Sequence, residues 1–280
     1  MGKQKKPGMK AAQPSNQALY EASVQNVEAD ADFVDRVFLK ERGRKPRLLR
    51  EDFCGTASLA AHWAGRHARN RSWGIDLDQP TLDWGMEHRV DLLGDAAERV
   101  ILVQGDVREV RLPRVDLQVA FNFSFFTFTE RSELRRYFRT VRRSLAKDGI
   151  FFLDLFGGSE STCVLEEKTR YRASVDPDGT RIPAFTYIWE QTRFNPIDGS
   201  LTCHIHFKWK GGKRRRAFNY EWRLWTLPEL RELLQEAGFA RVDTYVEGWD
   251  DKADEPDGRF RRRRRFDNSG GWIAYLVALK

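Results

Sequence analysis

The stretch LLREDFCGTASLAAHW, residues 48–63, decides the fold class of this chain. A short apolar run ends in two acids, Glu51 and Asp52, and is followed by the turn FCG and an alanine-rich helical segment. This order predicts a β-strand, a tight turn and a helix start. In an open parallel sheet, a turn at the carboxyl end of a strand is where backbone amides and a helix N-terminus face a ligand.

The same alternation of strand and helix continues through the first half of the chain. Strand-like apolar runs occupy residues 72–76, 99–106, 116–126 and 150–158, and helix-like segments occupy 56–68, 79–94 and 130–149. Because parallel strands need crossover connections, this pattern predicts an α/β fold with a doubly wound, mostly parallel sheet.

The pattern changes after residue 160. Residues 184–194, 201–209 and 217–225 alternate apolar and polar side chains with turns between them, which is typical of an antiparallel meander. A helix (226–239) and two strands (240–248 and 271–280) then follow. The meander therefore reads as an insertion within one sheet-based fold.

We expect the following organisation. Residues 18–280 form a single domain, preceded by a disordered basic tail over 1–17. Within it we expect an N-terminal helical lid at 18–45, a cofactor-binding half at 46–158, the inserted meander at 160–226, and C-terminal elements at 227–280 that complete the sheet.

Composition excludes some classes of protein. No segment approaches the roughly 20 apolar residues that a membrane-spanning helix needs, and the mean hydropathy is −0.62. Three scattered cysteines do not form a disulfide framework or a CxxC metal site, so we expect a reducing, cytoplasmic environment. The net charge is +7, with arginine-rich runs at 208–216 and 259–266. Such runs suit a polyanion or a solvated loop, and the acidic stretch 247–257 would neutralise the second one locally.

Three acids end successive strands of the predicted sheet: Glu51, Asp76 and Asp106. Asp76 follows Gly55 by 21 residues, a spacing that suits a carboxylate accepting hydrogen bonds from both ribose hydroxyls. Asp106 is placed to accept from an exocyclic amine such as that of adenine. The turn lacks the GxGxxG pattern that admits a pyrophosphate, and acids at the strand end favour a cationic ligand.

Taken together, LLREDFCGTASLA, GIDLD, QGDV, VAFNFSFF and GIFFLDLFGG resemble the successive motifs of class I S-adenosylmethionine-dependent methyltransferases. The resemblance implies a Rossmann-like sheet of seven strands whose last strand is antiparallel to the rest, and S-adenosylmethionine as cofactor. The family usually has two or three glycines in the first turn, whereas this chain has Phe53 and Ala57 at the flanking positions.

The resemblance also implies roles for individual residues. Glu51 and Gly55 would flank the methionine moiety, Asp76 the ribose, and Asp106 with Val107 the adenine, while Asn122 and Phe123 would face the methyl group. The predicted cofactor-binding set also includes Arg50, Cys54 and Leu77. From the residues alone, Arg50 suits either the donor's carboxylate or a structural ion pair.

The acceptor side carries fewer signals. Asn122 is a candidate for orienting an acceptor amine or hydroxyl, and no catalytic residue is assigned, because methyl transfer mainly requires positioning. Tyr20, Arg223 and Trp225 are candidate substrate contacts. His204 and His206 are expected on a solvated strand face, and no metal site is predicted.

Three hypotheses follow. The first is methyl transfer to a small-molecule acceptor at nitrogen or oxygen. The second is an RNA methyltransferase whose arginine-rich loops hold the substrate, and the third is a non-catalytic nucleoside-binding scaffold. A nicotinamide-dependent oxidoreductase ranks last because the glycines are missing.

Overall fold

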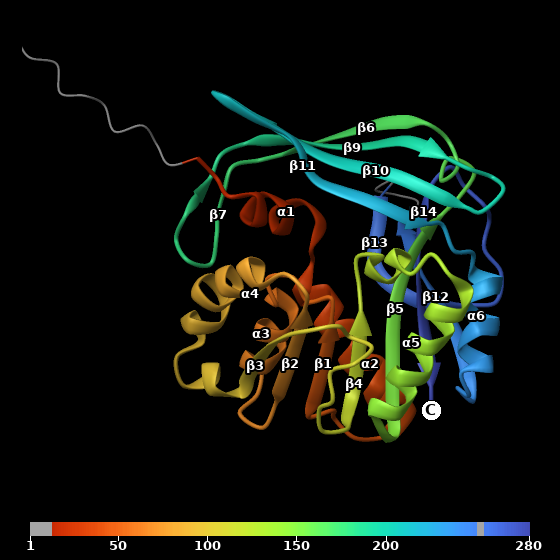
Figure 1. Ribbon diagram of the computed structural model, residues 1–280. Coiled ribbons are helices and arrows are strands. Elements are labelled where there is room, and N and C mark those ends of the chain that lie inside the picture. Colours follow the sequence, from red (N-terminus) through yellow and green to blue (C-terminus); the bar gives the residue numbers. More distant parts are fainter. Residues whose placement is uncertain (1–12, 251–254) are drawn as a thin grey trace, which may run out of the picture.

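The computed structural model describes residues 13–250 and 255–280. Its main sheet has eight strands in the order β13-β12-β14-β5-β4-β1-β2-β3 (Figure 1). Their bounds are β1 (Leu48–Asp52), β2 (Arg71–Asp76), β3 (Val100–Gln104), β4 (Val115–Ala120), β5 (Leu145–Gly157), β12 (Arg241–Asp250), β13 (Glu255–Arg263) and β14 (Trp272–Leu279). Strands β1 to β5 are parallel, and β14 runs antiparallel to β5. The predicted fold class is confirmed.

The sheet has one strand more than the seven that the resemblance implies. Most of β13 comes from the charged segment that reads as a loop in the sequence, and it pairs antiparallel with β12. The segment begins with Glu, Pro, Asp and Gly, which are depleted in strands, so the pairing with β12, a tertiary effect, makes it a strand.

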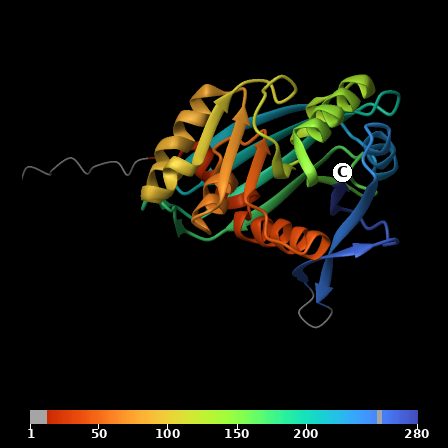
Figure 2. The same ribbon diagram turned by 90° about the horizontal axis from the view of Figure 1, so that it is seen from below.

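Helices cover both faces of the main sheet (Figure 2). On one face, α2 (Val27–Arg42) and α3 (Ser58–Gly65) enclose a core that includes Phe33, Phe38 and Trp63. On the other face, α5 (Arg131–Ser144) and α6 (Leu227–Glu236) pack on a second core. Helix α5 ends at Ser144, before the predicted end at 149, because the chain already pairs with β4 from Leu145 onward.

A second sheet of four antiparallel strands lies across the carboxyl ends of the main sheet, at the top of Figure 1. Its strands are β6 (Leu165–Tyr171), β9 (Phe185–Phe194), β10 (Ser200–Trp209) and β11 (Gly212–Arg223), with the small hairpin β7 (Ser174–Val175) and β8 (Arg181–Ile182) beside them. Helix α1 (Asn16–Val24) packs beneath it, and its Tyr20 ring lies 4.9 Å from that of Phe218.

The predicted lid helices therefore separate in space, since α1 contacts the second sheet and α2 contacts the main sheet. Helix α1 is capped by the side chain of Ser15, so residues 15–17 belong to an ordered helix start. Residues 1–12 of the predicted tail lie outside the described residues. Within the described chain, no helix is long and apolar enough to cross a membrane.

The strand order places a switch point between β1 and β4. From β1 the chain builds outward through β2 and β3 on one side, and through β4 and β5 on the other. Ligands of open α/β sheets bind in the crevice at such a point. The remaining helical segments on the β2–β3 side are α4 (Gln79–Gly85), η1 (Met86–Val90) and η2 (Asp91–Arg99), and η3 (Ser124–Thr127) follows β4.

Candidate active site

The turn after β1 has an unusual backbone for its sequence. Phe53, Gly55 and Ala57 have φ values of 57°, 52° and 55°, so three alternate residues adopt the left-handed conformation. That conformation suits glycine but costs other residues about 1–2 kcal/mol each. The Phe53 ring packs 5.8 Å from both Phe128 and Tyr137, and Ala57 is fully buried, so packing offsets the strain.

Two carboxylates hold the amides of this segment. The Asp76 Oδ2 accepts from the Gly55 N–H at 2.8 Å, and its Oδ1 accepts from the Asp78 N–H at 3.0 Å. The Glu51 Oε2 accepts from the Ala60 N–H, in the first turn of α3, at 2.8 Å. Burial raises the pKa of Glu51 to about 8, so this carboxyl is poised to ionise when a cation approaches.

The edge beyond β2 and β3 carries the other predicted cofactor residues. Leu77 is 67% exposed, an unusual degree for a large apolar side chain and suitable for contact with a flat base. Asp106 is paired with Arg108 at 2.6 Å, and this guanidinium holds the pKa of the carboxyl below its usual range. Val107 is buried beside it.

The sequence leaves two roles open for Arg50, and the structure shows the second of them, a structural ion pair. Its guanidinium pairs with Asp52 at 2.6 Å and donates to the carbonyls of Val107 and Val110. Both charged side chains are essentially inaccessible, and they lie on the strand face opposite Glu51. Arg50 therefore does not belong to the cofactor-contacting set.

Cys54 contributes its backbone to the turn. Its side chain is buried, and a Cβ at Gly74 would lie 2.9 Å from its Sγ. The thiol thus fills the space under the turn, where burial raises its pKa well above the usual value.

The turn after β4 is held in a different way. Asn122 and Phe123 both adopt the left-handed conformation, with φ of 58° and 59°. Their amides donate to the two carboxylate oxygens of Asp154 in β5, each at 3.0 Å. Burial raises the pKa of Asp154 to about 7. Sequence reasoning missed this residue, although a lone acid inside the apolar run IFFLDLF is a detectable signal.

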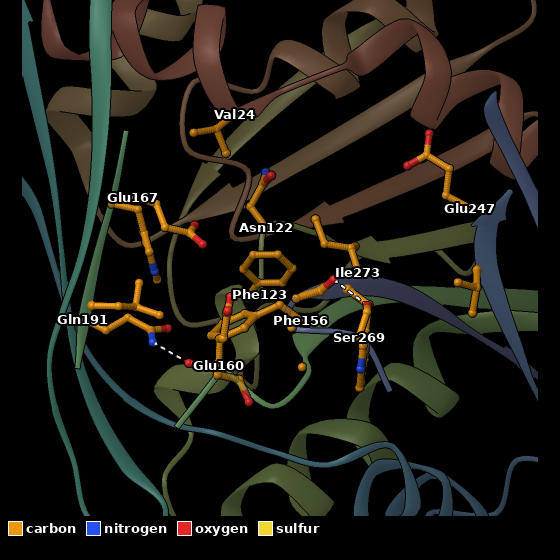
Figure 3. Close-up of a pocket in the computed structure, with 18 of the residues that line it drawn as sticks. Val24, Asn122, Phe123, Phe156, Glu160, Glu167, Gln191, Glu247, Ser269 and Ile273 are labelled. Carbon is orange, nitrogen blue, oxygen red and sulfur yellow. Dashed lines mark hydrogen bonds between the residues drawn. The ribbon is translucent and has the colours of Figure 1, made fainter. Parts of the chain in front are cut away.

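A cavity of about 650 Å³ opens directly beside Asn122 and Phe123. Phe123 and Phe156 form one wall, shown in Figure 3, and the second sheet forms the opposite one. The second sheet, which roofs the cavity, contributes Tyr187, Trp189, Tyr220 and Trp222, and α1 contributes Tyr20. The aromatic stripes of the meander therefore face this cavity and α1.

The charged residues that line the cavity, among those described, are all acidic. Its four ionisable acids are Glu160, Glu167, Glu247 and Asp267, and no Lys, Arg or His of the described chain lines it. Gln191 on β9 donates to the carbonyls of Glu160 and Cys163, at 3.1 and 2.8 Å, and so ties the segment between β5 and β6 to β9. Figure 3 shows the bond to Glu160.

Two of the predicted substrate contacts are wrong. Arg223 lies on the opposite face of β11 from the cavity-lining Trp222, pairs with Glu229 at 3.1 Å and stacks over Trp225. Trp225 is buried and donates from Nε1 to the Phe128 carbonyl at 3.1 Å. Neither lines the cavity, since Arg223 is held by Glu229 of α6 and Trp225 by the Phe128 carbonyl.

The two histidines of β10 are also placed differently from the prediction. His204 and His206 are buried rather than solvated. His204 bonds Asn219 at 2.8 Å, and His206 bonds Glu190 at 2.9 Å. Neighbouring strands β9 and β11 supply these partners and cover the rings.

A buried ion-pair network joins the turn after β1 to helix α1 and to the β7–β8 hairpin. Glu21 on α1 accepts from the Thr56 hydroxyl and from Arg89 Nε, the latter at 2.7 Å. Arg89 also pairs with Asp176, between β7 and β8, at 2.8 Å. This network connects α1, the turn after β1 and the second sheet's hairpin.

Comparison with known proteins points to one superfamily. The family described as "Methyltransferase domain" matches residues 52–153. A malonyl-[acyl-carrier protein] O-methyltransferase of Geobacter sulfurreducens is 28% identical over 206 residues, or 73% of this chain. The chain's match spans 60% of the length of that curated relative.

Solved structures share the fold across nearly the whole chain. An S-adenosylmethionine-dependent methyltransferase from Clostridium acetobutylicum superposes with a TM-score of 0.64 at 16% identity, over 93% of this chain and 96% of the other. An amino pentose methyltransferase from Micromonospora echinaspora, with S-adenosylmethionine bound, gives 0.65 at 17% identity, over 94% and 95%.

The side chains at the strand ends fit this cofactor. Acids line the edge from β1 to β3, and the basic group beside them, Arg108, is already paired with Asp106. That set suits a ligand with a sulfonium and an ammonium, and it disfavours a pyrophosphate. Residues 52–153 thus match a methyltransferase domain, the fold is that of solved S-adenosylmethionine-dependent methyltransferases, and the side chains at the strand ends fit S-adenosylmethionine as cofactor.

Proposed function

We propose that this chain transfers a methyl group to a small-molecule acceptor, at nitrogen or oxygen, with an amine nitrogen favoured. One observation carries the proposal. The roofed cavity of about 650 Å³ begins at Asn122 and Phe123, where the resemblance places the methyl group. Its volume lies within the usual range for small-molecule sites.

On the donor side, each residue has one task. Asp76 would accept from the ribose hydroxyls, and Asp106 from the adenine amine, with Leu77 and Val107 against the base. Glu51 and Gly55 would hold the methionine portion. Bound S-adenosylmethionine supplies a methyl group already activated by its sulfonium, so the protein's main contribution is positioning.

On the acceptor side, the lining favours a cationic group. Aromatic faces attract cations, and carboxylates pair with them. Trp189 and Trp222 provide such faces, and Glu167 provides a charge. Methylation of an ammonium requires loss of one proton, which a cavity carboxylate can accept. The relatives named above include both an amino pentose methyltransferase and an O-methyltransferase, so the cavity decides our preference.

We also place the reaction in the cytoplasm. All three cysteines are free, and Cys163 is exposed, which fits a reducing compartment.

The test is methyl transfer from radiolabelled donor into a cell extract, with products separated by size and by ribonuclease sensitivity. We expect label in small, ribonuclease-resistant molecules whose methylated nitrogen carries a positive charge, detected by electrophoresis at acidic pH. Label in ribonuclease-sensitive polymer would contradict the proposal. Donor binding without transfer to any fraction would instead support a scaffold role.

A further inference from the structure

A second cavity, of about 460 Å³, adjoins the acceptor cavity. Its lining includes Arg231 on α6 and Arg263, Arg264 and Arg265 at the end of β13. Phe266 lines both cavities, and its ring packs 5.2 Å from that of Trp272, another acceptor-cavity residue. The acidic, aromatic chamber and the basic one therefore meet at Phe266.

The fold explains why the arginines gather there. Arg263 pairs with Thr244 of β12, which also lines this cavity, while Arg262 on the opposite strand face pairs with Asp243 at 2.7 Å. Helix α6 presents Arg231 one turn after Pro228 on the face that lines the cavity.

These arginines have no protein partner in the described chain. None of the four makes an ion pair or a side-chain hydrogen bond with a described residue, whereas Arg241 and Arg262 each pair with an acid. The cavity has one carboxylate, Glu232, so its lining carries a net charge of +3 (four arginines, one acid). Four arginines that line one hollow and have no ion-pair partner among the described residues favour an oxyanion ligand.

We propose that the arginine cavity binds a phosphate group on the acceptor molecule, whose methylated end enters the aromatic chamber past Phe266. The inference rests on the proposed function. Guanidinium groups bind phosphate oxygens in bidentate pairs, and the doubled negative charge of phosphate matches this lining better than a single carboxylate. The acceptor would then be a phosphorylated amine, with its cationic and anionic ends recognised separately.

The first experiment measures binding without activity. Inorganic pyrophosphate is titrated into the full chain by calorimetry, for wild type and for Arg264→Gln/Arg265→Gln. The matched control, Arg214→Gln/Arg215→Gln on β11, removes the same charge outside both cavities. We expect the cavity variant to bind at least about tenfold more weakly and the control to change less than about twofold. Equal losses in both variants, or no binding to wild type, would overturn the proposal.

Two further arms separate the alternatives. A single-stranded RNA oligonucleotide that binds far more tightly than pyrophosphate, and loses affinity in both variants, would show a nucleic-acid surface and overturn the proposal. S-adenosylmethionine binding is measured on the same samples. If the wild type does not bind it, the result counts against the proposed function and leaves the anion-binding result to be judged by itself. In the extract assay, the labelled product should bind an anion-exchange column, and phosphatase treatment should abolish this binding. Label that does not bind the column before phosphatase treatment would contradict the inference.

Discussion

The two sides of Asn122 are built by different means. On the donor side, carboxylates hold backbone amides, as the partly exposed Asp76 holds Gly55 and the buried Asp154 holds Asn122. On the acceptor side, aromatic side chains from distant segments enclose the cavity, with Phe156 below and Trp189 above. The donor side is therefore a matter of backbone geometry, and the acceptor side one of side-chain shape and charge. Damage to one should leave the other measurable.

The largest effect is expected from Asp154→Asn. The amide would turn an NH₂ group toward one of the two backbone N–H donors, which leaves a buried polar group unsatisfied. We expect the free energy of unfolding to fall by about 3 kcal/mol, with loss of both donor and acceptor binding. Urea unfolding measures it, and the exposed Asp95→Asn should change stability by less than about 0.5 kcal/mol. An unchanged free energy of unfolding would mean that the bonds from Asp154 to the turn after β4 contribute little to stability.

Asp76→Ala should separate the two sides. We expect donor affinity to drop about 100-fold, because charged hydrogen bonds to both ribose hydroxyls and to Gly55 are lost. Unfolding stability should change little, since Asp76 lies at the surface edge. Calorimetric titration with S-adenosylmethionine provides the measurement, and Asp83→Asn on α4 is the control. Undiminished donor binding would remove the ribose assignment.

Donor affinity should also depend on pH through Glu51. Burial raises the pKa of Glu51 to about 8, so below pH 8 its neutral form dominates and a bound cation must displace a proton. Affinity should therefore rise up to about 50-fold from pH 6 to pH 8 and level off above about pH 9. Calorimetry in buffers of different ionisation enthalpy would detect the released proton. A similar rise in Glu51→Gln would show that another group titrates.

A smaller effect is expected on the acceptor side from Glu167→Gln. Because this carboxylate is exposed, its loss should raise the acceptor KM about fivefold, with donor affinity unchanged. Its neighbour Glu166 pairs with Lys168 at 2.5 Å and does not line the cavity, so Glu166→Gln is the matched control. Equal effects of the two substitutions would argue against the amine preference.

The smallest difference concerns Phe53. Both Phe53→Gly and Phe53→Ala remove the ring, but only glycine relieves the left-handed backbone. The glycine variant should be more stable than the alanine variant by about 1 kcal/mol, the reverse of their order in regular structure. Urea unfolding of the two variants decides this, and a more stable alanine variant would mean that the turn relaxes.

The donor side could be predicted from the sequence because the carboxyl ends of neighbouring parallel strands meet at one edge of a sheet. Strand order and spacing are enough to bring Glu51, Asp76 and Asp106 to that edge. They give no role to Asp154, whose partners lie on another strand, although an acid in an apolar run is a signal. Arg50 is ambiguous in the sequence because its neighbours Glu51 and Asp52 face opposite ways.

The acceptor side depends on long-range packing that local patterns do not encode. Alternation predicts that Tyr220 and Trp222 share a face, but the packing that buries Trp225, whose Nε1 bonds the distant Phe128 carbonyl, needs the tertiary fold. The edge strand β13 is missed for the same reason, since the residues EPDG at its start favour a loop until β12 pairs with it.

The burial of Cys54 and Cys203 has a practical consequence. With both thiols shielded and their pKa values raised, Cys163 is the exposed thiol of the three, and its carbonyl is bonded by the cavity residue Gln191. A maleimide fluorophore should therefore attach to the natural chain at a single position, next to the cavity-lining Gln191. The protein thus carries its own labelling handle, from which ligand entry can be followed in real time without engineering a cysteine.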